Sequence, residues 1–321
     1  MAHQNLTPFL AERYEAVKNR FPGEGRRKWR LRVADEFWKL SPDEKAAYAL
    51  KSLNEGAEFN VENGESAPYN NDEDPLDFIA GEDAPGLGII VRADYSNEDA
   101  WQTFLSKLRA AEAELASGKA AEPEGAESSD DDDKMDEDQQ PSSSNSAATE
   151  TAEDDEDDDT PEASPIFAIF NPPPGSGLHS LLTRIPSPVS QEPHHPTNLT
   201  ALRLLTDVDI RKAPLPPQGT KRIRPPNRLI DYDQWQEVYR GKGIWIYDER
   251  SNVDQCVRVV SLEGGAYGTA TADSWRARVS HICELQVNLA AGAMTIDFGG
   301  LDRYDYNERL LNLAEAEKDI A

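Results

Sequence analysis

The chain has 321 residues, and 33 Lys and Arg against 60 Asp and Glu give a formal net charge of −27. Its two cysteines, Cys256 and Cys283, exclude a disulfide framework, and the lack of an apolar run of about 18 residues predicts no membrane span. No secretory signal is evident at the start, so we expect an intracellular protein in a reducing compartment.

The charge is distributed unevenly along the chain. Residues 122–162 carry 19 acids and one base, a net of −18, whereas residues 1–53 carry 11 bases and 7 acids, a net of +4. Segments of opposite sign are typical of a basic binding module joined to an acidic tail or insert.

The first predicted helix begins with Thr7 as its N-cap and Pro8 in its first turn, where the missing N–H of proline costs little. Apolar residues recur from Leu10 to Phe21 at spacings of four, three and four, which places them on one helix face. Pro22 ends this helix.

Two further helices are predicted before residue 60. The second covers about 25–39, and its apolar face carries Trp29, Val33 and Phe37. The third opens at Ser41, where Ser-Pro-Asp-Glu forms a capping box, and its expected inner face is Ala47, Leu50 and Leu53. Residues 1–60 therefore form a predicted three-helix domain.

The remainder predicts a second domain of a different class. Residues 61–85 have the composition of a linker, and residues 119–165 that of a disordered acidic insert. Predicted strands cover 88–92, 166–170, 243–247 and 256–260. Predicted helices cover 97–115, 199–205, 232–239, 273–289 and 306–319. This alternation indicates an α/β layered domain whose parts, 86–118 and 166–321, are separated by the insert.

Residues 6–59 resemble the HMG box. The resemblance rests on Pro8-Phe9 at the start of the first helix, on Phe21-Pro22-Gly23 at its end, and on the order of Trp38, the Ser-Pro-Asp-Glu-Lys segment from Ser41, and Tyr48. Members of that family fold as an L of three helices and bind the minor groove, where an apolar wedge between base steps bends the duplex.

The resemblance implies a set of DNA contacts in this chain. The expected DNA-binding bases are Arg13, Lys18, Arg20, Arg26, Arg27, Lys28, Arg30, Arg32 and Lys39. The expected wedge is Phe9 or Leu10, and the expected core of the box is Tyr14, Trp29, Trp38 and Tyr48. The basic arm that precedes the first helix in the family is replaced here by Ala2-His3-Gln4-Asn5-Leu6, which weakens the expected binding.

The second domain is loosely similar to an uncharacterised α/β domain of bacteria and fungi. The similarity rests on Ile90-Val91-Arg92-Ala93-Asp94-Tyr95-Ser96, Ile244-Trp245-Ile246-Tyr247-Asp248, Trp275 and the segment from Asn288 to Phe298. It implies a fold and no chemistry. Arg92, Asp94 and Asp248 lie at predicted strand ends, where ligands bind in open α/β sheets, but such residues are also ordinary turn formers.

We expect no catalytic residues, no metal and no cofactor. His281 and Cys283 are two apart on a predicted helix, so they point in different directions, and the sequence offers no third ligand beside them. The chain is therefore predicted not to be an enzyme.

A basic segment follows the insert. Residues 203–228 carry seven bases and two acids, and the cluster is Lys221, Arg222, Arg224 and Arg228. It is interpreted as a nuclear localisation signal, a second nucleic-acid contact, a docking segment for the acidic insert, or a solvated loop.

Three roles remain open for residues 122–162. They are a solvating segment, a competitor for the basic face of the same chain, or a binding segment for histones or another basic partner. The leading hypothesis is a nuclear, chromatin-associated HMG-box-like protein that binds duplex DNA weakly and without sequence preference. The alternative is a protein-interaction module that does not bind DNA and whose insert binds a basic partner.

Overall fold

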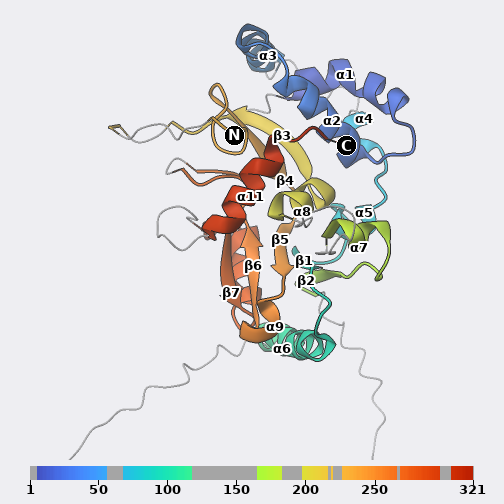
Figure 1. Cartoon of the computed structure of the whole chain (residues 1–321), viewed down its shortest axis with the longest axis vertical. Coiled ribbons are helices and arrows are strands. Elements are labelled where there is room, and N and C mark those ends of the chain that lie inside the picture. The colour runs from blue at the N-terminus through green and yellow to red at the C-terminus, as the bar shows by residue number, and fades with distance from the viewer. Residues whose placement is uncertain are drawn as a thin grey trace, which may run out of the picture.

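The computed structural model describes residues 6–55, 68–117, 165–182, 197–215, 218–219, 226–265, 268–296 and 305–320. Figure 1 shows an N-terminal group of helices at one end of the molecule and a β-sheet in the body, with helices α6 and α9 at the opposite end. The acidic insert, residues 119–165, lies outside the described residues apart from its last position.

The three predicted N-terminal helices are confirmed. They are α1 (Thr7–Arg20), α2 (Arg26–Trp38) and α3 (Pro42–Glu55). The N-cap of α1 is Leu6, not Thr7, because the chain is already helical at that residue. The capping box is present, since the Glu44 carboxylate accepts hydrogen bonds from the Ser41 N–H at 2.9 Å and from its hydroxyl at 2.7 Å.

The predicted inner face of α3 is wrong. Ala47 and Leu50 are exposed, Leu50 by 62%, whereas Lys45 is buried. The Lys45 ammonium lies 5.5 Å from the ring centre of Trp38 and 5.1 Å from that of Tyr232. These cation–π contacts turn Lys45 toward the core, and Ala47 and Leu50 face solvent. The side chain of Leu53 lies outside the described part.

Residues 68–80 of the expected linker are folded onto the N-terminal helices. This segment forms α4 (Pro68–Asn71) and α5 (Asp77–Ala80), and the Tyr69 ring packs edge-on against Tyr14 with centroids 6.1 Å apart. The earlier residues of that expected linker, 61–67, lie outside the described residues. Residues 68–80 are a structural element because they carry both an aromatic anchor and the carboxylates described below.

A five-stranded mixed sheet forms the body. Its strands are β1 (Gly88–Arg92), β2 (Phe167–Phe170), β5 (Gly243–Tyr247), β6 (Cys256–Val260) and β7 (Ser274–Arg278), in the order β2-β1-β5-β6-β7. The first three are parallel, and β6 and β7 are antiparallel to their neighbours. Helix α6 (Glu98–Ala116) follows β1, and the acidic insert falls between α6 and β2, inside one βαβ unit.

A two-stranded antiparallel sheet links the helices to this body. It pairs β3 (Asp207–Lys212) with β4 (Trp235–Arg240). The helix predicted over 232–239 is therefore wrong, because pairing with β3 overrides the local pattern. The helix predicted over 273–289 is also wrong in part, since its first third is β7. The remaining helices are α7 (Gly177–Leu182), α8 (Asn198–Leu205), α9 (Ser251–Asp254), α10 (Ile282–Ala290) and α11 (Tyr306–Ala316).

One hydrophobic core runs from the N-terminal helices into the sheet. Phe37 of α2, Leu202 of α8 and Ile244 of β5 are fully buried in the same cluster. The Phe37 ring lies 5.9 Å from that of Trp235 in β4. A second cluster covers the other sheet face, around Trp245. The N-terminal helices, expected to be a separate domain, thus share their core with the α/β part.

Helix α11 is held in place by a buried ion pair. The Arg309 guanidinium lies 3.1 Å from Asp273, whose carboxylate also accepts the N–H of Ala270 at 2.8 Å. Burial raises the pKa of Asp273 from 3.8 to about 6, against the opposing effect of Arg309.

We expect this raised pKa to make wild-type stability fall with rising pH relative to an Asp273→Asn variant. In the folded protein the Asp273 carboxyl stays protonated up to about pH 6, whereas in the unfolded chain it loses its proton near pH 3.8. Its stabilising contribution is present below pH 3.8 and lost as pH rises through 6. The difference in unfolding free energy between the wild type and the variant should change by at most about 3 kcal/mol between pH 4 and 7. Urea unfolding at several pH values measures it. Parallel pH profiles contradict this assignment.

Candidate functional site

Helix α2 carries most of the bases that the sequence assigns to DNA, and it lies against the rest of the chain. This helix contacts α4, β3 and α8. Arg27 and Arg30 are buried, and the side chain of Arg26 is only 12% exposed. The rest of the chain therefore covers most of these three side chains.

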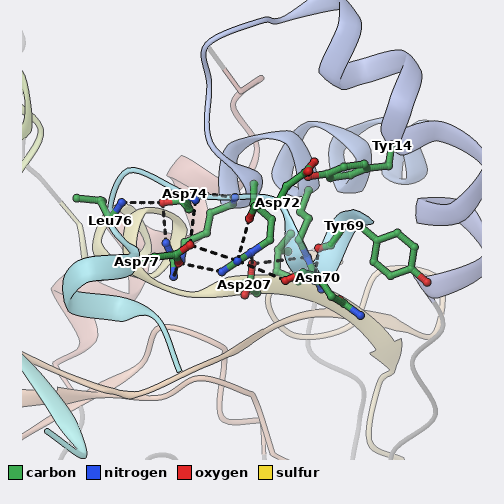
Figure 2. A network of polar contacts seen from close by, with 12 residues as sticks. Tyr14, Tyr69, Asn70, Asp72, Asp74, Leu76, Asp77 and Asp207 are labelled. Carbon is green, nitrogen blue, oxygen red and sulfur yellow. Dashed lines mark hydrogen bonds and ion pairs between the residues drawn. The ribbon is translucent and has the colours of Figure 1, made fainter. Parts of the chain in front are cut away.

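Arg27 is clamped by two carboxylates of the 68–80 segment. Its guanidinium donates to Asp74 at 2.6 Å and to Asp77 at 2.7 Å, and its backbone N–H also donates to Asp74 at 2.9 Å. Arg26 shares Asp77 at 3.0 Å. Figure 2 shows these carboxylates converging on the basic face of α2. Charge-assisted bonds of this length are the strong class of hydrogen bond.

Asp207 and Asp72 complete the network. Asp207, at the start of β3, lies 3.6 Å from Arg26 and 3.7 Å from Arg30. Arg30 also donates to the carbonyl oxygens of Tyr69 (3.2 Å) and Val208 (3.3 Å). It therefore joins α2 to α4 and β3.

On α1, Lys18 and Tyr14 share one acceptor. Asp72 accepts the Lys18 ammonium at 2.6 Å and the Tyr14 hydroxyl at 2.9 Å. The hydrogen bond to Asp72 raises the pKa of Lys18 above its ordinary value. Lys18, predicted to contact DNA, thus keeps its charge but already has a carboxylate partner.

Of the other predicted DNA contacts, Arg32 is 15% exposed, and Arg13, Lys28 and Lys39 are closer to solvent. Glu24 binds Arg32 at 2.7 Å and Lys28 at 3.1 Å, and the hydrogen bond from Arg32 holds the pKa of Glu24 below its ordinary value. Two more ion pairs are Arg13 with Glu36 at 3.0 Å and Lys39 with Asp35 at 2.7 Å. Arg20 is exposed and its guanidinium lies over the Phe21 ring.

The acidic 68–85 segment also changes the charge of the N-terminal unit. Residues 68–85 contain six acids and no base, which takes the +4 of residues 1–53 to −2 for the two segments together. The excess of basic residues in 1–53 is therefore more than offset by the acids that fold against it.

The predicted wedge residues lie in the core. Phe9 and Leu10 are 3% and 2% exposed, and the Phe9 ring packs edge-on against Phe37 and Tyr48 at 5.6 and 5.0 Å. Neither side chain can enter a base step unless the helices separate, and in this structure both residues belong to the core.

The predicted core residues are placed as follows. Tyr14 and Trp29 are buried, with their rings packed edge-on, and Trp38 and Tyr48 are half-buried against the same core. Trp38 also donates from its indole N–H to Glu237 of β4 at 3.0 Å. This tryptophan therefore serves the contact with the sheet as well as the packing of the helices.

The predicted basic segment is only partly described. Lys221, Arg222 and Arg224 lie outside the described residues. Arg228 is buried, 3.4 Å from both Asp35 of α2 and Glu237 of β4. For Arg228 the expectation of a localisation or docking residue is therefore corrected: it connects the helices to the two-stranded sheet.

A groove of about 1570 Å³ separates α2 and α5 from the β4–β5 turn and the loop after β6. Its charged lining is evenly balanced. The bases are Arg26, Arg27, Arg30, Arg240 and Lys242, and the acids are Asp77, Glu82, Asp83, Asp207 and Glu263. This balance does not favour a phosphate or another simple anion.

The strand-end residues of the sheet are engaged with each other. Arg92 donates to Glu98 at 2.7 Å, and Asp94 accepts from Asn252 at 2.7 Å. Although burial opposes ionisation of Asp248, Arg258 and Arg276 at 2.9 and 2.8 Å hold its pKa below the ordinary value. These contacts give the strand ends a structural role within the described chain.

Metal and thiol chemistry find no support among the described residues. No group of three or more His, Cys, Asp or Glu side chains there is arranged to hold a metal ion. Cys283 is buried, which raises its pKa to about 12, so the reactive thiolate is disfavoured. No helix in the described ranges combines the length and apolar character of a membrane span.

Sequence reasoning missed the acidic half of the network. Asp72, Asp74 and Asp77 fall in a stretch expected to be a linker, and Asp207 starts a strand that was not predicted. The available signal was the presence of six acids and no base in residues 68–85, downstream of a basic helical unit, which is the pattern of an internal counter-charge.

Comparison with known proteins returned no relative. No family model, curated protein or solved structure matches this chain.

Proposed function

We propose that this chain is a non-enzymatic nuclear protein-interaction module, in which an HMG-box-like helical unit has a structural role and residues 122–162 bind a basic protein such as a histone. One observation carries the proposal. Eight of the nine bases expected to contact DNA lie within 3.7 Å of a carboxylate of the same chain. The side chains of three of these bases, Arg26, Arg27 and Arg30, are at most 12% exposed. Their partners Asp74, Asp77 and Asp207 are labelled in Figure 2.

This network bears on the role of the acidic insert. A segment that competes with DNA in cis needs an open basic face on its own chain, and that face is already neutralised by residues 68–80 and Asp207. The insert also connects to α6 and β2, and α6 lies at the end of the molecule opposite α1 and α3 (Figure 1). The −18 charge of the insert is therefore available to a partner in trans.

The test of this role is binding of purified core histones to the full chain. A variant in which residues 122–162 are replaced by a Gly/Ser stretch of equal length is the matched control, since it preserves the βαβ connection. We expect the replacement to weaken binding by about tenfold or more at near-physiological salt. Equal affinity of the two proteins contradicts the proposal.

Weak duplex DNA binding is the second candidate, favoured by cations that remain near solvent. Arg13 and Arg20 are seven apart on α1, and Lys28 of α2 and Lys39 at its C-cap are eleven apart, so each pair lies on one side of its helix. Exposed ion pairs are worth at most about 1 kcal/mol, and phosphates can compete for these side chains.

We expect the full chain to bind duplex DNA with a shallow salt dependence. Four phosphate contacts correspond to a slope of about −3.6 in log K against log salt, and the buried network adds nothing to it. The full chain is used because the helices share their core with the sheet. A titration at several salt concentrations measures the slope. A slope near −8 requires all nine bases to be free and overturns the structural role of the helical unit.

A further inference from the structure

Lys45 is a buried cation without a carboxylate partner. It is 1% exposed, and its ammonium lies 5.5 Å from the ring centre of Trp38 and 5.1 Å from that of Tyr232. No oxygen of the described residues accepts a hydrogen bond from this ammonium, and Asp233 acts on it only from beyond ion-pair distance. Within the described chain, the two rings are therefore the only close partners of its charge.

Arg92 shows how a comparable cation is held elsewhere in the chain. Its guanidinium also lies over two rings, 4.3 Å from that of Tyr95 and 4.8 Å from that of Trp101, and it is 3% exposed. In addition it donates to the Glu98 carboxylate at 2.7 Å. A structural cation that is buried among rings thus has a counter-charge here, which Lys45 lacks.

A strained turn holds one of the two rings beside Lys45. Asp233 and Gln234 have φ of 53° and 73°, a left-handed conformation that is uncommon outside glycine. Tyr232 and Trp235 flank this turn and exchange backbone hydrogen bonds of 2.8 and 3.0 Å. The Tyr232 ring packs edge-on against that of Trp38, with centroids 5.8 Å apart, and both residues are only half-buried. Backbone strain of this kind is concentrated at binding sites.

The two rings are better suited to a methylated ammonium than to Lys45. A lysine ammonium is strongly hydrated and carries three N–H donors, so placing it between rings leaves these donors without acceptors. This desolvation lowers the pKa of Lys45, against the opposing effect of Asp233. A trimethylated ammonium keeps the attraction to the rings and has no N–H that needs an acceptor.

The Lys45 side chain can leave the rings while its helix stays attached. Helix α3 packs against α1 at the end of the molecule (Figure 1). Tyr48 anchors it there, because its ring lies 5.0 Å from that of Phe9 and its hydroxyl donates to Glu12 at 2.9 Å. Turning Lys45 outward restores the hydration of its ammonium and vacates the space between Trp38 and Tyr232.

We propose that Trp38, Tyr232 and Asp233 form a binding site for an N-methylated lysine side chain of a partner protein, and that Lys45 occupies this site when the partner is absent. The rings supply the cation–π attraction, and the exposed Asp233 supplies the counter-charge. The site contains no residue of 122–162, so it is independent of the role proposed for the acidic insert.

The test measures binding of two labelled peptides to the full chain by fluorescence anisotropy. One peptide carries a single trimethyllysine and the other a single lysine, each flanked by Gly and Ser. We expect the trimethyllysine peptide to bind at least about tenfold more tightly than the lysine peptide. Lys45→Ala, which vacates the rings, should raise the affinity for the trimethyllysine peptide by about tenfold. Lys51→Ala removes an exposed lysine from the same helix and should leave the affinity unchanged.

Two further variants complete the design. Lys45→Gln keeps a side chain of similar length without the charge and should shift the affinity in the same direction as Lys45→Ala. Tyr232→Leu removes one ring and should weaken binding of the trimethyllysine peptide by at least about tenfold. Circular dichroism checks that each variant is folded.

Four results overturn the proposal. They are no binding of the trimethyllysine peptide by either Lys45 variant, equal binding of the two peptides, an affinity of both Lys45 variants no higher than that of the wild type, and an unchanged affinity in Tyr232→Leu. Replacement of residues 122–162 by a Gly/Ser stretch should leave binding of the trimethyllysine peptide intact, which separates this site from the proposed histone-binding role of the insert.

Discussion

Replacing Arg27 by Met is expected to lower the free energy of unfolding by about 3–5 kcal/mol, because it leaves a buried carboxylate without its cation. The side chains of Arg27 and Asp74 are 4% and 6% exposed, and their atoms lie 2.6 Å apart. Met fills a similar volume, so the loss reports the missing charge and hydrogen bonds and not a cavity. Chemical unfolding followed by tryptophan fluorescence and circular dichroism measures it.

The neighbouring residue provides the control. Lys28 is also paired with a carboxylate, Glu24 at 3.1 Å, but its side chain is half exposed. Lys28→Met should therefore change stability by less than about 1 kcal/mol. An equal loss of unfolding free energy in the two variants would show that residues 68–80 do not hold the helices through Arg27. The proposed structural role of the basic residues would then be wrong.

A double variant separates the pair from its surroundings. In Arg27→Met combined with Asp74→Asn the uncompensated charge is gone, so part of the lost stability should return. A recovery shows that the bases of α2 act as a fixed counter-charge for residues 68–80. It also explains why a cluster of Arg residues at the start of a helix does not by itself indicate a nucleic-acid surface.

Elements with a strong local signal could be predicted from the sequence. The strands at 88–92, 243–247 and 256–260 are short apolar runs with β-branched residues, and the structure confirms all three. The helix over 97–115 is also confirmed, as α6, because its apolar residues recur at helical spacing and Asn97 caps it. In these segments local propensity and tertiary packing agree.

Elements that depend on a distant partner could not be predicted. The strand β4 carries Gln236 and Glu237 between apolar residues, and its register is set by β3, which precedes it by more than twenty residues. The burial of Lys45 in α3 depends on Tyr232 of the same hairpin region. Pairing across such separations leaves no local period, so the sequence pattern predicts the wrong element or the wrong face.

The same reason applies to the candidate site. The bases of α2 are visible in the sequence as a cluster, but their fate depends on Asp74 and Asp77, 47 and 50 positions away from Arg27. Net charge per segment describes solvation and long-range attraction, and it does not say which charges are paired in the fold. The helix face that was predicted to bind DNA therefore contacts residues of the same chain.

Replacing Glu237 by Ala is the second change with a large expected effect, again about 3–5 kcal/mol of unfolding free energy. Glu237 is 1% exposed and accepts the Tyr239 hydroxyl at 2.6 Å and the Trp38 indole N–H at 3.0 Å. It also lies 3.4 Å from Arg228 and 3.8 Å from Arg203. Its loss leaves two buried guanidinium groups short of a counter-charge, which guanidinium chloride unfolding measures.

The unfolding transition of the Glu237→Ala protein tests whether the N-terminal helices and the sheet unfold together. Trp38 belongs to the N-terminal helices and Glu237 to β4, so this hydrogen bond crosses from one part of the molecule to the other. Because the two parts share one core, we expect helix content and tryptophan fluorescence to be lost in a single transition at a lower midpoint. Glu237→Gln, which keeps an acceptor oxygen for Trp38, should lose less. Two separate transitions in the wild type would instead mean that the helices fold alone, and their basic face would again be open to DNA.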